Sequence, residues 1–197
     1  MTPEPPLQEE LSLPLRTPRL ILRDFRDEDF DDIHAYGSDP EVCRYMPWGP
    51  NTLEDTAQAL ARMRAQARAW PRMELGLGIE LAAEGRLIGS IALHLRDATH
   101  RTVEMGYCLH RDYWGQGIMS EAARGLADAG FRRFGLHRIY ATCDIRNTGS
   151  WRVMERLGMR REGLLRQDRQ VKGAWRDTYL YAVLAEEWTA SAASARG

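Results

Sequence analysis

The chain has 197 residues, and its 44% hydrophobic content is enough to bury one domain of ordinary size but is short for two. With 27 Lys and Arg against 28 Asp and Glu, the net charge of −1 excludes an overall field that would attract nucleic acid or an anionic membrane. No apolar run approaches the roughly 20 residues of a membrane span, and the Pro-rich, acidic N-terminal segment lacks the basic and apolar regions of a signal peptide.

The composition predicts flexible tails at 1–15 and 189–197 around one folded domain at 16–188. The first half of this domain should contain, in chain order, a strand at 19–23, an acidic helix at 27–36, a longer helix at 51–70, and strands at 75–82 and 86–95. A capping box of Asn51 and Glu54 should begin the longer helix, which Pro71 ends. Its buried face is expected to hold Leu53, Leu60, Met63, Ala67 and Trp70.

The second half continues with a strand at 102–110, a glycine loop, a helix at 120–134 and a strand at 138–145. A short helix at 149–157 ends at Gly158, and two strands at 160–168 and 178–184 flank a turn at Lys172 and Gly173. This order predicts a mixed α+β domain, in which an antiparallel meander is followed by a right-handed crossover to a parallel strand.

The three cysteines, Cys43, Cys108 and Cys143, form neither a CxxC pair nor an even disulfide framework. Cys108 and Cys143 lie in predicted strands, where they are expected to act as small buried hydrophobic residues. The five histidines are scattered without the spacing of a zinc site, so no metal is expected. Free cysteines favour a reducing compartment, and we expect a cytoplasmic enzyme or binding protein.

The segment YWGQGIMSEA at 113–122 joins the strand at 102–110 to the helix at 120–134. Such a layout binds phosphate-bearing ligands, because glycines let the backbone come close and the unpaired N–H groups of the first helical turn point at the anion. A tight turn between a strand and a helix could use the same glycines without binding anything.

Four segments resemble the GNAT acyl-CoA-dependent N-acetyltransferases, and within them the Rim-type acetyltransferases of ribosomal-protein N-termini. They are TPRLILRDF at 17–25, EMGYCLHRDYWGQG at 104–117, IRNTGSWRVMERLGMRREG at 145–163 and WRDTYLYAVLAEEW at 175–188. The resemblance covers residues 19–188. It implies a central, mostly antiparallel mixed sheet flanked by helices, with acetyl-CoA as co-substrate between two splayed parallel strands.

The resemblance also implies the residues that bind coenzyme A. The loop backbone would hold its pyrophosphate through Trp114, Gly115, Gln116, Gly117, Ile118, Met119 and Ser120. Met119 stands where the family has Gly or Ala, and its side chain would be harmless if it pointed into the core. The strand residues Leu109 and His110 would pair with the pantetheine arm and offer an N–H to the thioester oxygen.

Four more residues sit on or near the short helix at 149–157. By resemblance, Asn147 binds a pantetheine amide and Ser150 is a candidate proton donor to the leaving thiolate, although Asn-x-x-Ser is also a plain helix cap. Many family members use a tyrosine as the donor, and this helix has none. Arg152 and Arg156 lie one turn apart and would meet the phosphates, or else form a solvated basic face.

Glu104 is the candidate general base. Strand alternation places Glu104, Gly106 and Cys108 on one face, and Val103, Met105, Tyr107 and Leu109 on the other. An amine attacks a thioester only when it is neutral, so a carboxylate that removes its proton, through a water, would serve the reaction. A structural carboxylate paired with an arginine is the alternative.

The implied reaction is direct transfer of an acetyl group, in a ternary complex, from acetyl-CoA to the α-amino group of a protein N-terminus such as that of a ribosomal protein. No cysteine lies beside an obvious base, which disfavours a covalent acyl-enzyme. Acetylation of a polyamine or an aminoglycoside is a second interpretation, with the acidic run at 24–32 as its pocket. A non-catalytic acyl-CoA-binding module is a third, and either a monomer or a homodimer is possible.

Overall fold

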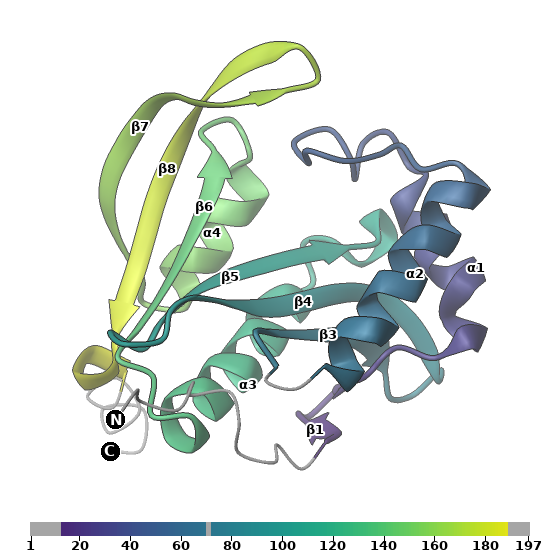
Figure 1. Cartoon of the computed structure of the whole chain (residues 1–197), viewed down its shortest axis with the longest axis horizontal. Coiled ribbons are helices and arrows are strands. Elements are labelled where there is room, and N and C mark those ends of the chain that lie inside the picture. The colour runs from purple at the N-terminus through teal and green to yellow at the C-terminus, as the bar shows by residue number, and fades with distance from the viewer. Residues whose placement is uncertain (1–12, 70–71, 189–197) are drawn as a thin grey trace.

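The computed structural model describes residues 13–69 and 72–188, which form one eight-stranded sheet with helices around it (Figure 1). The strands are β1 (Leu15–Arg16), β2 (Leu20–Arg23), β3 (Glu74–Leu81), β4 (Arg86–Asp97), β5 (Thr102–Leu109), β6 (Arg138–Asp144), β7 (Arg160–Val171) and β8 (Ala174–Leu184). The helices are α1 (Phe30–Gly37), α2 (Leu53–Arg68), α3 (Ile118–Arg133) and α4 (Thr148–Arg156), with short 3₁₀ turns η2 (Asp27–Asp29) and η3 (Arg111–Tyr113). The expected α+β fold is confirmed.

The strand order is β1-β2-β3-β4-β5-β6-β8-β7, and only the β5–β6 pair is parallel. That pair is short, because Cα partners run only from Thr102–Arg138 to Glu104–Tyr140. Beyond Glu104 the two strands diverge, and β6 continues upward with β8 and β7 while β5 stays with β4 (Figure 1). The sheet is therefore divided into two halves that meet only at the start of β5 and β6.

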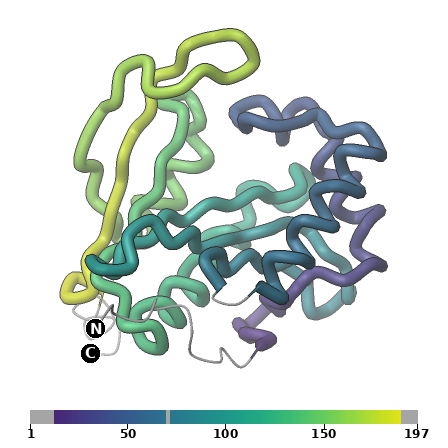
Figure 2. The backbone as a smooth tube through the Cα atoms, in the orientation of Figure 1, coloured from purple at the N-terminus to yellow at the C-terminus, as the bar shows by residue number. Residues whose placement is uncertain are grey.

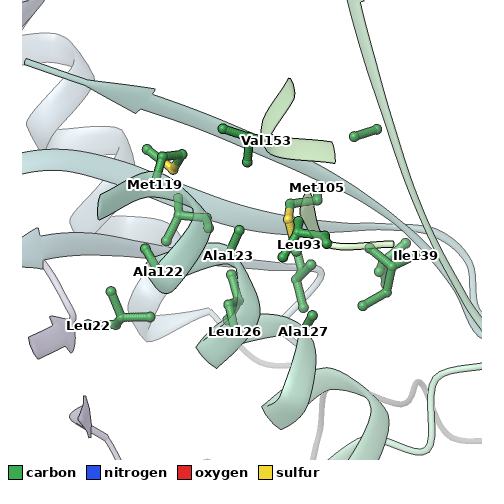
Figure 3. Packing of buried hydrophobic residues seen from close by; sticks show 14 of the residues in the cluster. Leu22, Leu93, Met105, Met119, Ala122, Ala123, Leu126, Ala127, Ile139 and Val153 are labelled. Atoms are coloured by element: carbon green, nitrogen blue, oxygen red, sulfur yellow. The ribbon is translucent and has the colours of Figure 1, made fainter. Parts of the chain in front are cut away.

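The helix α3 lies under the junction of the two halves and supplies much of the core (Figure 3). Its buried face is rich in alanine, and the small side chains of Ala122, Ala123 and Ala127 are almost fully buried. These alanines let the helix approach the sheet closely, where it packs in one cluster with Leu93 and Ile139. The helices α1 and α2 share a second cluster with Cys108 on the opposite face of β5.

The start of α2 differs from expectation by one residue. Thr52, not Asn51, is the N-cap: its Oγ1 accepts the N–H of Asp55 at 3.1 Å, and the Asp55 carboxylate accepts the N–H of Thr52 at 2.9 Å. The N–H of Asn51 instead donates to the Gly37 carbonyl at the end of α1. This tertiary contact fixes Asn51 outside the helix and moves the capping box to the next residue pair.

The buried face of α2 also differs, because Leu53 is exposed whereas Leu60 and Thr56 are buried. The strand β1 begins at Leu15, within the segment predicted to be flexible. Trp70, Pro71 and the predicted tails at 1–12 and 189–197 lie outside the described residues. Among the described residues, no helix combines the length and apolar composition that a bilayer span requires.

A buried ion network ties β2 to η2 and β3. The Arg23 guanidinium donates two hydrogen bonds of 2.8 Å to Asp29 and one from Nε to Glu80, and all three side chains are nearly inaccessible. Hydrogen bonding to Asp29 raises the pKa of Arg23 above its ordinary value. Asp29 also accepts the Arg26 N–H at 2.7 Å, so the network fixes the chain where it leaves the sheet for α1.

We expect Arg23→Met to lower the free energy of unfolding by about 3–5 kcal/mol, because it leaves two buried carboxylates without a cation. Urea unfolding of the wild type and the variant measures this loss. Arg62→Met is the matched control on the exposed surface of α2, and it should change stability by no more than about 0.5 kcal/mol. Equal unfolding midpoints for the two variants would show that the network contributes no net stability.

Candidate active site

A cavity of about 730 Å³ lies where the two halves of the sheet diverge. Its walls come from β5, β6 and β8, from the loop and first turn that lead into α3, and from the start of α4. A segment that precedes α2, at 41–47, closes one side. The cavity thus gathers residues from three of the four sequence segments that resemble the GNAT family, those at 104–117, 145–163 and 175–188, together with the segment 41–47.

The glycine loop enters the cavity with two residues in the left-handed region, Gly115 at φ 74° and Gly117 at φ 75°. Gly117 is the N-cap of α3, so the N–H groups of Ile118, Met119 and Ser120 begin a 16-residue helix without intrahelical acceptors. The Ser120 hydroxyl is buried and has no hydrogen-bond partner among the described residues. This collection of unpaired donors suits the phosphates of a nucleotide-like ligand.

Two side chains of this loop, those of Met119 and Gln116, have surroundings that bear on ligand binding. Met119, in the first turn of α3, is 6% exposed and packs in the core (Figure 3), so its side chain does not crowd the loop. Gln116 does not line the cavity: its side chain donates to the Asp112 carbonyl at 2.9 Å, and its own carbonyl accepts from Arg19 at 3.1 Å. The expectation that Gln116 meets the ligand is therefore not supported by its position.

The N-terminal segment holds the loop in place through Glu121 in the first turn of α3. Glu121 accepts hydrogen bonds from the Arg19 side chain at 2.7 Å, the Arg19 N–H at 2.8 Å and Thr17 at 2.6 Å. Arg19 also reaches the carbonyl of the loop residue Gln116. The segment TPRLILRDF thus contributes to the site indirectly, by fixing the backbone that precedes α3.

The free edge of β5 presents alternate residues to the cavity. The His110 N–H donates to the Ile88 carbonyl at 2.8 Å, so the backbone of His110 faces β4. By alternation, the N–H and C=O groups of Met105, Tyr107 and Leu109 face the gap left by β6. The predicted donor at His110 is therefore wrong, because the ladder with β4 uses its N–H, and Leu109 is the residue whose backbone faces the gap.

Trp114 covers the end of this edge. Its indole Nε1 donates to the Leu109 carbonyl at 2.8 Å, and 49% of the residue is exposed. Because the bond uses only the carbonyl, the N–H of Leu109 remains directed at the gap. Trp114 therefore joins the glycine loop to the last residue of β5.

Glu104 lies in the cavity wall at the point where β5 and β6 separate. One carboxylate oxygen accepts Arg96 Nε at 2.9 Å and Nη2 at 2.7 Å, and the other accepts the Thr142 hydroxyl at 3.1 Å. The alternative of a carboxylate paired with an arginine is thus observed. The pair is open to solvent, since the Arg96 side chain is 53% exposed.

Asn147 and Ser150 form the cap of α4. The Asn147 Oδ1 accepts the Ser150 N–H at 3.2 Å, as in the plain capping interpretation, and this leaves the two amide hydrogens of Asn147 available to a ligand. Both residues line the cavity. The Ser150 hydroxyl lies 3.0 Å from the hydroxyl of Tyr107, which also donates to the Ser150 carbonyl.

Tyr107 is a site residue that sequence reasoning missed. Alternation put it on the face of β5 opposite Glu104, where an aromatic side chain is expected to pack, and it does pack against the core. Its hydroxyl nevertheless reaches α4, and burial raises the pKa of Tyr107 above its ordinary value. Because the contact joins residues 43 positions apart, no local pattern in the sequence could reveal it.

Two arginines of α4 add positive charge to the cavity. The Arg152 guanidinium stacks on Trp151 at 5.5 Å, and the backbone carbonyl of Arg156 accepts a hydrogen bond from Arg124. Both side chains line the cavity, and within the described part of the chain neither forms an ion pair with a carboxylate. Their charge is therefore available for an anionic ligand.

The tip of the β7–β8 hairpin bends toward the segment 41–47, as the backbone trace shows (Figure 2). Lys172 at the tip donates to the Cys43 carbonyl at 2.6 Å, and the Arg146 guanidinium lies over the Tyr45 ring at 5.6 Å. These two contacts connect the halves of the molecule above the cavity. The cavity is therefore covered on this side by contacts between segments that are distant in the sequence.

The acidic run at 24–32 does not contribute to the cavity. Asp24 pairs with Arg72, Asp27 with Arg64, Asp29 with Arg23 and Asp32 with Arg86. None of these carboxylates lines the cavity wall. The suggestion that this run forms the acceptor pocket of a polyamine acetyltransferase is therefore wrong, because the run lies outside the cavity that holds Glu104 and four of its six carboxylates pair with arginines.

The cysteines are buried thiols. Cys43 and Cys108 are buried and Cys143 is half-buried, and burial raises the pKa of Cys108 to about 12 and of Cys143 to about 11. The expected packing role is confirmed for Cys108 and holds in part for Cys143. Among the residues described by the structure, no three His, Cys, Asp or Glu side chains are grouped to hold a metal ion.

Comparison with known proteins places this geometry in a family. The model of the acetyltransferase (GNAT) domain matches residues 19–160. The uncharacterized N-acetyltransferase YnaD of Bacillus subtilis is 36% identical over 175 residues, which cover 88% of this chain and 98% of the relative. The ribosomal-protein-serine acetyltransferase of Escherichia coli is 34% identical over 151 residues, 72% of this chain and 82% of the relative. A crystal structure of a GNAT-family acetyltransferase from Bacillus anthracis superposes with a TM-score of 0.79 at 36% identity, covering 89% of this chain and all of that chain.

We expect iodoacetamide to alkylate Cys108 and Cys143 slowly at pH 8, because the thiolate reacts and a raised pKa keeps each thiol protonated. Alkylation of Cys143 should be roughly a hundredfold slower than in a urea-unfolded sample. Raising the pH toward the pKa of Cys143 should accelerate its labelling before that of Cys108. Mass spectrometry of the labelled peptides measures both rates, and rapid labelling of folded Cys143 at pH 8 would contradict the assigned burial effect.

Proposed function

The chain belongs to the GNAT acetyltransferase family, and we propose that it acetylates the α-amino group of a protein N-terminus, such as that of a ribosomal protein, in the cytoplasm. The enzyme class itself is that of the acetyl-CoA-dependent N-acetyltransferases. The observation that carries the proposal is the meeting of three features in one cavity: a free strand edge, a glycine loop with unpaired N–H groups, and Glu104 at the point of divergence. Similarity to a relative named ribosomal-protein-serine acetyltransferase supports the protein acceptor.

Different residues of the cavity suit different parts of acetyl-CoA. The backbone of the loop and first turn would hold the pyrophosphate, through Trp114, Gly115, Gly117, Ile118, Met119 and Ser120. Arg152 and Arg156 supply charge for the phosphates. The edge of β5 at Leu109 and the amide of Asn147 supply backbone-like donors and acceptors for the pantetheine arm, which would lie along β5 as an added strand.

Acetyl-CoA brings a thioester whose carbonyl carbon the acceptor amine attacks. A C–N bond forms, the C–S bond breaks, and the N–H of Leu109 faces the oxygen that gains negative charge. Glu104 takes the proton of the amine through a water, and Arg96, half exposed, is able to move aside as it does so. Ser150, held by its bond to Tyr107, donates its proton to the leaving thiolate and regains one from solvent, while Glu104 returns the proton of the amine to solvent, so that one proton leaves nitrogen and one reaches sulfur.

The test is coenzyme A release from acetyl-CoA, followed with a thiol reagent, across peptides with free N-termini, polyamines and aminoglycosides. Turnover on a free N-terminal peptide, and none on the same peptide with a blocked N-terminus, is the expected result. Turnover confined to lysine side chains or to small amines would replace the acceptor and keep the enzyme class. Acetyl-CoA binding without turnover on any amine would reject catalysis in favour of an acyl-CoA-binding module.

We expect Glu104→Gln to lower kcat by roughly a hundredfold at pH 7, because the amide keeps the shape of the side chain but cannot take a proton. The loss should shrink as the pH rises through the pKa of the acceptor, about 8 for an α-amino group, since more of the amine is then neutral. The KM for acetyl-CoA should stay unchanged. Unchanged kcat at pH 7 would remove Glu104 from the mechanism.

Ser150→Ala is the matched comparison for this pH profile. Because Ser150 acts on the leaving thiolate, its loss should lower kcat by a similar factor at every pH. Tyr107→Phe, which removes only the hydroxyl bonded to Ser150, should act in the same direction with a smaller effect. A rescue of Ser150→Ala at high pH would assign its effect to the amine and not to sulfur.

A further inference from the structure

A second polar group lines the cavity beyond Glu104, on β6 and the β7–β8 hairpin. We call it the acceptor-end cluster; it consists of Thr142, Asp144, Arg146, Arg169, Arg176 and Thr178. Asp144 and Thr178 are register partners, and Thr142 and Arg176 lie two residues from them, so these four share one face of the sheet. The coenzyme A assignments above use none of these residues.

The charges of this cluster do not balance. Asp144 accepts two hydrogen bonds from Arg146, of 2.8 and 2.6 Å, and Arg169 pairs with Asp168 at 3.0 Å. Within the described ranges, no carboxylate lies within ion-pair distance of Arg176. Although burial opposes it, hydrogen bonds from Arg146 and the nearby charge of Arg176 lower the pKa of Asp144. Arg176 is thus close to this carboxylate without an ion pair to it, and among the described residues it is the surplus cation of a cluster with three arginines and one carboxylate. Around the whole cavity, seven arginines face three carboxylates, so the wall repels a polycationic acceptor.

The Thr178 hydroxyl points to a ligand independently of the charges. The residue is 1% exposed and lines the cavity, yet its Oγ1 has no hydrogen-bond partner within the part of the chain that is described. A buried hydroxyl normally has a partner, since burial without one is costly. A ligand oxygen in the cavity would supply the partner and would lie on the same sheet face as Arg176.

Thr142 connects this cluster with the proposed base. Its hydroxyl donates to Glu104 at 3.1 Å and accepts from Arg169 Nη2 at 3.4 Å. The Thr142 side chain therefore lies between Glu104, the proposed base, and Arg169, a cation of the cluster. An anionic group bound by this cluster would therefore lie on the same side of the cavity as the proposed base.

We propose that Arg176 and Thr178 form a subsite for a carboxylate carried near the acceptor amine, with Arg169 at its border. This rests on the proposed function, in which the acceptor is an N-terminal peptide: the peptide would carry Asp or Glu within its first residues. A guanidinium and a hydroxyl are the groups that bind a carboxylate through charge-assisted hydrogen bonds. The same subsite would take the carboxylate of a small amino acid, and the test separates these two sources.

The first measurement is calorimetric binding, in the presence of coenzyme A, of three peptides that differ only in Asp, Asn or Lys at the second position. Binding does not depend on turnover, so a failure of the proposed reaction leaves this test intact. We expect the Asp peptide to bind roughly tenfold or more tightly than the Asn peptide, and the Lys peptide most weakly. Equal affinities for Asp and Asn, together with no binding of free glutamate, would overturn the subsite.

Arg176→Gln should remove the preference for Asp and leave binding of the Asn peptide unchanged, and Thr178→Val should reduce the preference in part. Arg62→Gln, on the exposed surface of α2, is the control. It removes the same single positive charge as Arg176→Gln and should retain the full preference for the Asp peptide. Retention of the preference in Arg176→Gln would assign it elsewhere and contradict the proposal.

Binding of free glutamate, compared with that of free glutamine, tests whether the carboxylate comes from a small amino acid or from a peptide. Tight binding of glutamate that Arg176→Gln abolishes, with no preference among the peptides, would retain the carboxylate subsite and reject the protein N-terminus as acceptor. Phosphoserine in the second peptide position tests the anion itself. Stronger binding of phosphoserine than of Asp would replace the carboxylate by a phosphate and overturn the assignment.

Discussion

The site depends on one constraint, the early end of the β5–β6 ladder. After three parallel pairs, β6 follows β8 away from β5, and the strand edge from Met105 to Leu109 is left without a protein partner along β6. Backbone N–H and C=O groups in such a gap need partners from outside the ladder. The glycine loop, the cap of α4 and Glu104 are all placed around this edge, so the divergence of two strands creates both the space and the need for an extended ligand.

Two interactions between arginine and carboxylate differ in exposure, and this difference distinguishes a structural role from a chemical one. Arg23 and its partners Asp29 and Glu80 are almost fully buried, and any separation would leave charges in a poor dielectric. Arg96 is half exposed beside Glu104, so water competes for its guanidinium and the pair is less isolated from solvent than that of Arg23. The first pair fixes the entry to α1, whereas the second leaves a carboxylate that an incoming amine or water is able to reach.

The distribution of arginines also decides what the cavity receives. Four of the six carboxylates in the acidic run at 24–32 pair with Arg72, Arg64, Arg23 and Arg86, outside the cavity wall. The cavity wall, by contrast, holds more arginines than carboxylates. A chain with a net charge of −1 therefore has a positive cavity, which suits a phosphate-bearing co-substrate.

The sequence by itself determined most of the elements and the place of the glycine loop, because both follow from local signals: alternation in β5 and the glycines before α3. Only the tertiary structure decided which groups meet. The bond of Tyr107 to Ser150, the use of the His110 N–H by Ile88, and the surplus charge of Arg176 each depend on strand register or on contacts between distant segments. Register and long-range pairing are set by how the whole core packs, and no local pattern encodes them.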